Sequence, residues 1–238
     1  METTAKAVDG GYVLNGYKAV ALNGAAADKV IVSARTSGDV GDQNGSSLFL
    51  LDADITERRN YPTLTGGNTA EIVLSDLKVS SAALLGEEGK ALAALETVHA
   101  RAIVAVCAEA LGAMESAKEL TNEYPKTRQQ FGRPIGKFQV LQHRMADILV
   151  EIEQARSSVI NAAANLDEPN RDLYISTAKN LIGRVGRQVA EETIQLHGGI
   201  DMTQEYDLAH FAKRIVLIDH MFGDTDHHLA RFISLGVA

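Results

Sequence analysis

The sequence predicts an α+β protein in which a partial antiparallel β domain is followed by a four-helix up-and-down bundle. Residues 1 to about 80 consist of short β-prone runs separated by polar, glycine-rich segments, a texture typical of an antiparallel sheet or barrel. From Gly86 onward, Ala, Leu, Glu, Gln and Arg dominate, and apolar residues recur at helical spacing. We therefore expect two domains, residues 1–85 and residues 86–238.

The first domain is expected to contain four β-prone runs, at residues 10–22, 29–36, 47–54 and 70–79. Within the first run, Asn15-Gly16 is a strong hairpin signal, because glycine reaches positive φ without steric cost. We therefore expect the chain to reverse there.

The second domain is expected to contain four helical segments, at residues 88–127, 137–166, 171–197 and 205–235. The first should bend or end near Pro125, because proline removes a backbone donor. The fourth should be interrupted near Gly223. Short links between the segments favour an up-and-down bundle.

The bulk composition is that of an ordinary globular protein, with 45% hydrophobic and 23% charged residues. A net charge of −8 argues against a nucleic acid or an anionic membrane as partner, since both favour basic surfaces. Cys107 lies in an apolar run and is expected to be a buried small hydrophobe. No signal pattern opens the sequence, and no stretch is expected to span a bilayer. We expect a cytoplasmic protein.

The most specific stretch is KTRQQFGRPIGKFQVLQHRMAD, residues 126–147, which predicts an exposed turn after a helix. Arg128 can pair with a phosphate through two hydrogen bonds, and Gln130 can donate and accept beside it. Phe131 can lie against a flat ring. An ordinary solvated turn explains the same spacing equally well.

A second glycine-rich stretch, QLHGGIDM at residues 195–202, ends the third expected helix. The simpler interpretation is that Gly198 or Gly199 caps the helix in a left-handed conformation. The functional interpretation is that the paired glycines let a ligand approach bare backbone while Gln195 hydrogen-bonds it. Taken alone, the stretch favours the cap.

Together, RQQFGRPIGKFQVLQHRMAD and the downstream QLHGGIDMTQEYDLAHFAKRI resemble the C-terminal half of an acyl-CoA dehydrogenase. The resemblance extends over residues 1–238 and implies that family's middle β domain and C-terminal helical bundle. It does not include the N-terminal helical domain with which such enzymes begin. The chain is therefore expected to be a truncated product, a fragment or an unusually short member.

The resemblance implies FAD as cofactor and oxidation of an acyl-CoA thioester to the 2,3-enoyl-CoA. In such enzymes a carboxylate removes the α-proton while the β-hydride passes to the flavin. Positions matching Arg128, Gln130, Phe131 and Gln139 contact FAD, the first three that of a neighbouring subunit. Positions matching Gln195, Gly198 and Gly199 hold its adenine end across the same interface.

The catalytic base of the family is missing from both places where the resemblance puts it. Those positions carry Gly223 and Ala100, and neither side chain can abstract a proton. Asp224 is one residue out of register and one methylene shorter than Glu, so it is a candidate base only if the local backbone differs. Val20 and Leu22 stand where the family commonly has a Trp and a Thr that contact the flavin ring.

The segment DHMFGDTDHH, residues 219–228, allows three interpretations: a metal site, an acid–base site at Asp224, or a helix start. We expect no metal, because adjacent His227 and His228 point about 100° apart on a helix. We favour a cap formed by Asp224 or Thr225. Thr225 and His227 also match family positions that touch FAD, and a His can donate to a phosphate.

This pattern resembles the small, non-catalytic subunits of heteromeric acyl-CoA dehydrogenases, whose partner supplies the ring contacts and the base. The alternatives are an active homotetramer using Asp224, an inactive scaffold subunit without FAD, and a bundle that only binds a ligand such as an acyl-CoA. The expected partners are an acyl-CoA from fatty acid or sterol side-chain metabolism, a homologous subunit in a homo- or heterotetramer, and, by family analogy, an electron-transfer flavoprotein.

Overall fold

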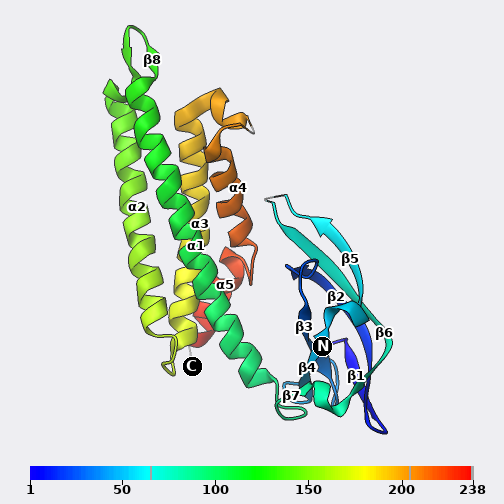
Figure 1. Ribbon diagram of the computed structural model, residues 1–238. Coiled ribbons are helices and arrows are strands. Elements are labelled where there is room, and N and C mark those ends of the chain that lie inside the picture. The colour runs from blue at the N-terminus through cyan, green and yellow to red at the C-terminus, as the bar shows by residue number, and fades with distance from the viewer. Residues whose placement is uncertain (65, 204, 237–238) are drawn as a thin grey trace. The chain divides into compact units, whose positions relative to one another are not determined.

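The computed structural model describes residues 1–64, 66–203 and 205–236 (Figure 1). The chain divides into two compact units, Met1–Thr97 and Val98–Ala238. Strands make up the first unit and helices most of the second, so the predicted α+β class is confirmed. The predicted domain boundary between residues 85 and 86 stays a prediction.

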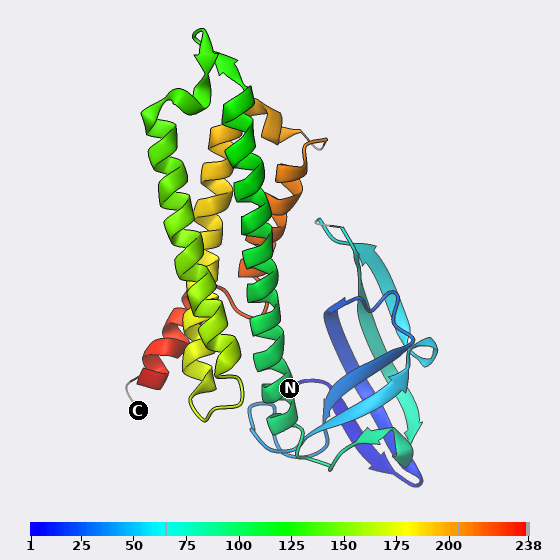
Figure 2. The ribbon, with the colours of Figure 1, turned by 60° about the vertical axis from the view of Figure 1, so that its left-hand side comes forward.

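The first unit is built around a seven-stranded sheet in the order β5-β6-β2-β1-β3-β4-β7 (Figure 2). Its strands are β1 (Thr4–Val8), β2 (Gly11–Leu22), β3 (Lys29–Arg35), β4 (Ser46–Asp52), β5 (Glu57–Pro62), β6 (Asn68–Ser80) and β7 (Leu84–Leu85). Neighbouring strands pair antiparallel, except that β1 meets β3 in parallel through Thr4 and Arg35. The expected antiparallel sheet is therefore a mixed sheet with one parallel pairing.

The predicted reversal at Asn15-Gly16 is wrong, because both residues lie inside the continuous strand β2. The chain turns instead at Asp9-Gly10, where Gly10 has a φ of 79°. Asn15-Gly16 forms a bulge, marked by the register shift between Leu14 and Gly16. The Asn15 side-chain amide donates to Asp76 Oδ1 on β6 at 3.0 Å, and its oxygen accepts from the Asp76 backbone N–H at 2.8 Å. The Asn15 side chain therefore stabilises the bulge and forms no turn.

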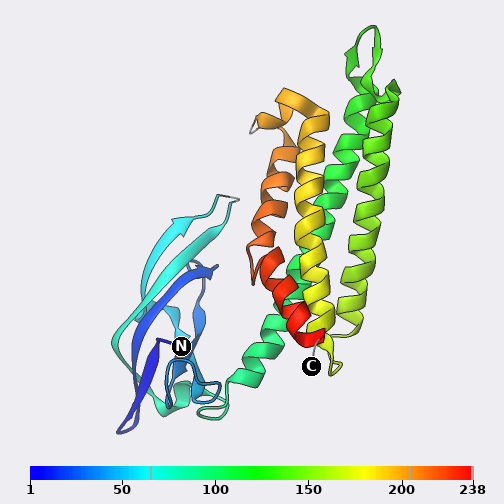
Figure 3. The same ribbon diagram turned by 180° about the vertical axis from the view of Figure 1, so that it is seen from behind.

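The described residues form five α-helices: α1 (Leu92–Thr127), α2 (Gln139–Ala164), α3 (Arg171–His197), α4 (Asp207–Asp219) and α5 (Thr225–Gly236). The first three correspond to the first three predicted segments, and α1 ends two residues after Pro125, as expected. The fourth segment is two helices separated around Gly223. Helix α3 packs against α2, α4 and α5 (Figure 3).

The bundle core is aliphatic and rich in alanine, which lets the helices approach closely. Cys107, Met114 and Ile152 are among its fully buried side chains. Burial raises the pKa of the Cys107 thiol to about 12, so the thiol stays protonated near neutral pH and packs as a small hydrophobe. The expectation that Cys107 is a buried small hydrophobe is confirmed.

Helix α1 corrects one prediction. By length and composition Leu92–Thr127 is apolar enough to cross a membrane, whereas the sequence was expected to contain no such stretch. Half of its most apolar window is buried inside the protein. Because the core helix of a bundle has the same composition, this property is weak evidence for a membrane span.

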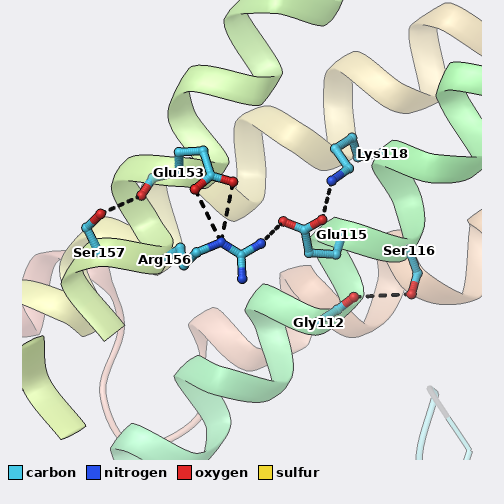
Figure 4. A network of polar contacts seen from close by, with 7 residues as sticks. All are labelled: Gly112, Glu115, Ser116, Lys118, Glu153, Arg156 and Ser157. Carbon is cyan, nitrogen blue, oxygen red and sulfur yellow. Dashed lines mark hydrogen bonds and ion pairs between the residues drawn. The ribbon is translucent and has the colours of Figure 1, made fainter. Parts of the chain in front are cut away.

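A polar network joins α1 to α2 on the bundle surface (Figure 4). Glu115 on α1 accepts hydrogen bonds from both Arg156 on α2 and Lys118. Arg156 also reaches Glu153 on its own helix, at 3.4 Å. Because the Glu115 side chain is only 21% exposed, this network is better shielded from solvent than an ordinary surface pair.

Candidate functional site

A short β-hairpin projects from the C-terminal end of α1 (Figure 1). Strands β8 (Gln129–Gln130) and β9 (Arg133–Pro134) pair antiparallel around the two-residue turn Phe131-Gly132. Both turn residues have positive φ, 54° and 75°, as a tight hairpin requires. Phe131 is 89% exposed at the tip, so the predicted exposed turn is confirmed.

The C-terminal end of α3 is closed by Gly198, with φ 68° and ψ −144°, a combination that favours glycine. The Gly198 N–H donates to the Ile194 carbonyl, which confirms the predicted glycine cap. A Cβ at Gly198 or Gly199 would meet no atom within 4 Å. Packing therefore leaves open space above both glycines, and bare backbone is accessible to a ligand.

The hairpin and the C-terminal end of α3 lie at the same end of the bundle (Figure 1). Residues of both line one depression of about 460 Å³. Of the predicted site residues, five line it: Arg128, Gln130, Gln195, Gly198 and Gly199. Within the described part of the chain, the side chains of Arg128, Gln130 and Gln195 make no hydrogen bond or ion pair. Three exposed polar groups thus stand uncommitted around an open glycine pair.

An aromatic wall, missed by the sequence analysis, backs this depression. The His197 ring stacks on Tyr124 with centroids 4.6 Å apart and lies 5.3 Å from the ring of Tyr206. His197 Nδ1 donates to the Thr193 carbonyl at 2.9 Å, and Nε2 has no hydrogen-bond partner among the described residues. The sequence signal that could have identified His197 is its position directly before the glycine pair.

Asp201 lies buried close to this wall, and sequence reasoning missed it as well. The residue is 3% exposed, and both carboxylate oxygens are without a hydrogen-bond partner among the described residues. Burial raises the pKa of this carboxyl above its usual range. No local sequence pattern marks an aspartate in this position as buried.

The remaining predicted residues do not line the depression. Gln139 is the exposed first residue of α2, and Thr225 and His227 lie in the first turn of α5. Asn180, which bonds the Thr225 carbonyl, precedes Gln195 by about 22 Å along α3 at helical rise. The predicted contacts at the start of α5 therefore lie against the N-terminal half of α3, away from the depression at its C-terminal end.

The start of α5 is capped by Asp224, as one interpretation predicted. Its Oδ1 accepts a hydrogen bond from the His227 N–H at 2.8 Å, and this bond holds the pKa of the carboxyl below its usual range. The neighbouring His228 ring is fully buried, and burial lowers its pKa to about 4. Among residues 1–64, 66–203 and 205–236, no group of three His, Cys, Asp or Glu is placed to hold a metal ion.

The two positions expected for a catalytic glutamate differ in their surroundings. Gly223 precedes the cap of α5 and has a φ of 94°. Ala100 is 4% exposed and packs in the bundle core. In the β unit, Val20 and Leu22 are 57% and 54% exposed on β2.

A β sheet followed by a helical bundle of this form is also found in solved flavin enzymes. The chain superposes on butyryl-CoA dehydrogenase from Megasphaera elsdenii with a TM-score of 0.91 and 31% identity, covering 100% of this chain and 63% of that one. The FAD complex of PigA gives 0.91 at 29% identity, covering 100% and 63%. The ChsE4-ChsE5 complex from Mycobacterium tuberculosis gives 0.87 at 25% identity, covering 99% and 62%.

The family model described as "Acyl-CoA dehydrogenase, C-terminal domain" matches residues 88–233. The chain belongs to the acyl-CoA dehydrogenase family, which confirms the resemblance. The short-chain specific acyl-CoA dehydrogenase of Megasphaera elsdenii is 34% identical over 84% of this chain and 54% of its own length. The probable acyl-CoA dehydrogenase YngJ of Bacillus subtilis (strain 168) is 32% identical over 91% and 59%. The chain thus spans between half and three fifths of these relatives.

Proposed function

We propose that this chain is part of an FAD-dependent acyl-CoA dehydrogenase that forms the 2,3 double bond of an acyl-CoA thioester. Its own contribution is to hold the phosphate and adenine of an FAD across a subunit interface. The observation that carries this proposal is the depression in which Arg128, Gln130 and Gln195 stand uncommitted beside Gly198-Gly199. A planar guanidinium matches phosphate oxygens, and the two amides can pair with the edge of a purine.

The residues present fit such a cofactor. The Arg128 guanidinium is exposed and has no ion pair within the described residues, so a phosphate would not have to displace a carboxylate. The space above the glycine pair lets a flat ring approach the backbone, and the exposed Phe131 offers a face for a second flat group. A bound flavin supplies the acceptor for the β-hydride of the acyl chain.

The proton chemistry is assigned to a homologous partner subunit. Gly223 has no side chain, and a carboxylate at Ala100 would replace a methyl group packed in the core. Asp224 is engaged as a helix cap, and its lowered pKa makes it a weak base. These observations favour a heteromer over an active homotetramer that uses Asp224. That one structural neighbour is itself a complex, of ChsE4 with ChsE5, agrees with this assignment.

The second candidate function is an inactive scaffold subunit that binds no FAD. It is disfavoured because a scaffold has no physical need of three uncommitted polar side chains around bare backbone. The proposal retains an acyl-CoA as substrate of the assembly, an electron-transfer flavoprotein as electron acceptor, and a cytoplasmic location. A third candidate, a bundle that only binds a ligand such as an acyl-CoA, predicts no flavin in any assembly.

The test is to replace Arg128 with alanine and measure FAD retention. A charge-assisted hydrogen bond contributes about 1.5–3 kcal/mol, so Arg128→Ala should weaken FAD binding by roughly tenfold to a hundredfold. The matched control is Arg187→Ala, which removes an 81% exposed arginine from α3 and should leave FAD retention unchanged. Equal retention in both variants contradicts the assignment of Arg128 to the cofactor.

A further inference from the structure

Lys179 is a fully buried lysine whose role the proposed chemistry leaves open. It lies on α3 with 0% of its surface exposed. Its Nζ donates to the carbonyl oxygens of Asp219, at 2.8 Å, and Gly223, at 2.7 Å. A buried ammonium is costly unless it is hydrogen-bonded, so these two bonds determine where the Lys179 side chain can end.

The two carbonyls bracket the turn between α4 and α5. Asp219 is the last residue of α4, and Gly223 directly precedes the residue that caps α5. Within this turn Phe222 and Gly223 both have positive φ, 57° and 94°. Such backbone persists only where its surroundings hold it, and the bond from Lys179 to the Gly223 carbonyl fixes that peptide group.

The same face of α3 seats the first residue of α5. The Asn180 amide donates to the Thr225 carbonyl at 2.9 Å, and the Thr225 hydroxyl donates to Asp219 Oδ1 at 2.8 Å. Gly183 makes room for this pair, because a Cβ there would lie 2.0 Å from Asp219 Oδ1 and 2.2 Å from Thr225 Oγ1. Residues 179, 180 and 183 therefore form one seat for the turn.

The turn between α4 and α5 also sets the position of the His227 ring. A Cβ on Gly223 would lie 2.5 Å from His227 Cδ2, so the ring rests against bare glycine backbone. The ring is exposed, and the His227 backbone N–H donates to the Asp224 carboxylate at 2.8 Å. A shift of the Gly223 peptide would therefore move the His227 ring.

We infer that Lys179 is a positioning residue for FAD: by holding the Asp219 and Gly223 carbonyls, it fixes the turn that presents the His227 ring to the cofactor. The inference rests on the proposed function and on the family resemblance, by which His227 matches a position that touches FAD. Lys179 itself touches no cofactor and acts only through the turn.

The experiment is a double-mutant cycle between Lys179→Met and His227→Ala, read as the FAD dissociation constant of the flavin-retaining protein, alone or with its co-purified partner. Lys179→Met should weaken FAD binding by about tenfold, and by clearly less in the His227→Ala background. Ile152→Ala, in the α2 core, is the control for general loss of stability. At a comparable fall in thermal midpoint, it should change FAD binding far less than Lys179→Met.

Two results would overturn the inference while leaving the proposed function intact. One is the same loss of FAD binding from Lys179→Met in both backgrounds, and the other is a loss no larger than that of Ile152→Ala. If Lys179→Met does not fold, Gly223→Ala takes its place in the cycle, since it crowds the His227 ring and keeps the lysine. An unaltered protein that retains no flavin in any assembly would overturn the proposed function and this inference together.

Discussion

Asp224 shows at the residue scale how a candidate base becomes a structural group once its partners are known. Its carboxylate accepts the His227 N–H at 2.8 Å, and the bond lowers its pKa. The Asp-Thr pair before a helix predicted the cap from sequence alone. By contrast, nothing local marked Lys179 or Asp201, because their burial depends on segments that meet only in the folded bundle.

The cap gives a prediction with a defined pH dependence. Because the folded-state pKa of Asp224 lies below its ordinary value of 3.8, its stabilising effect is fully present above about pH 4 and is lost as pH falls through the folded-state pKa. Asp224→Ala should lower the thermal midpoint at pH 7, and the difference from the unaltered protein should shrink below pH 4. Asp224→Asn, which keeps an acceptor oxygen, should lower the midpoint less. Equal midpoints of Asp224→Ala and the unaltered protein at pH 7 would refute the cap.

At the element scale, the positions of helices were predictable and the connections of strands were not. The apolar periodicity predicted the helices, and Gly223 predicted the break between α4 and α5. Asn15-Gly16 and Asp9-Gly10 carry the same turn chemistry, and only the pairing of β2 with β6 decides that the first is a bulge. Strands β1 and β5 lay outside the predicted runs. Strand β5 reads Glu-Arg-Arg-Asn-Tyr-Pro, and its low apolar content explains why no strand was predicted there.

The seat of the α4–α5 turn on α3 can be tested with a pair of glycines. Gly183→Ala should destabilise the protein by about 1–3 kcal/mol, because its Cβ would overlap Asp219 and Thr225. Gly112→Ala, on α1, meets no atom within 4 Å and should stabilise the helix by about 0.5–1 kcal/mol. Chemical denaturation measures both changes. A Gly183→Ala protein as stable as Gly112→Ala would show that the turn does not lie against α3.

The network that ties α1 to α2 predicts a second contrast (Figure 4). Glu115→Ala leaves Arg156 and Lys118 without their shared acceptor and should cost roughly 1–2 kcal/mol of unfolding free energy. Glu123→Ala removes a 69% exposed partner of Lys126 and should cost less than about 0.5 kcal/mol. Urea denaturation at low and high salt separates the two. Equal costs would mean that the network is an ordinary surface pair.

At the scale of the whole molecule, the two textures of the sequence predicted the α+β class, and the short links between helical segments predicted the bundle that the comparisons support. The convergence of Arg128 and Gln130 with Gln195 in one depression was implied by that resemblance. Helical periodicity alone could not have predicted this convergence, because periodicity identifies the buried face of a helix and does not show which helix ends lie together. The family resemblance puts the catalytic glutamate at positions that carry Gly223 and Ala100 here, and the structure adds that Ala100 fills a core position.

The central claim is that this chain offers its FAD contacts to a shared site. The most direct test is the visible absorption spectrum of the chain purified alone and of the chain co-expressed with a full-length homologous acyl-CoA dehydrogenase from the same genome. A shared site predicts flavin absorbance in the co-purified complex only, at less than one FAD per chain. Stoichiometric flavin on the chain alone would contradict the shared site and favour a homo-oligomer with Asp224 as base, and no flavin in either sample would favour the inactive scaffold.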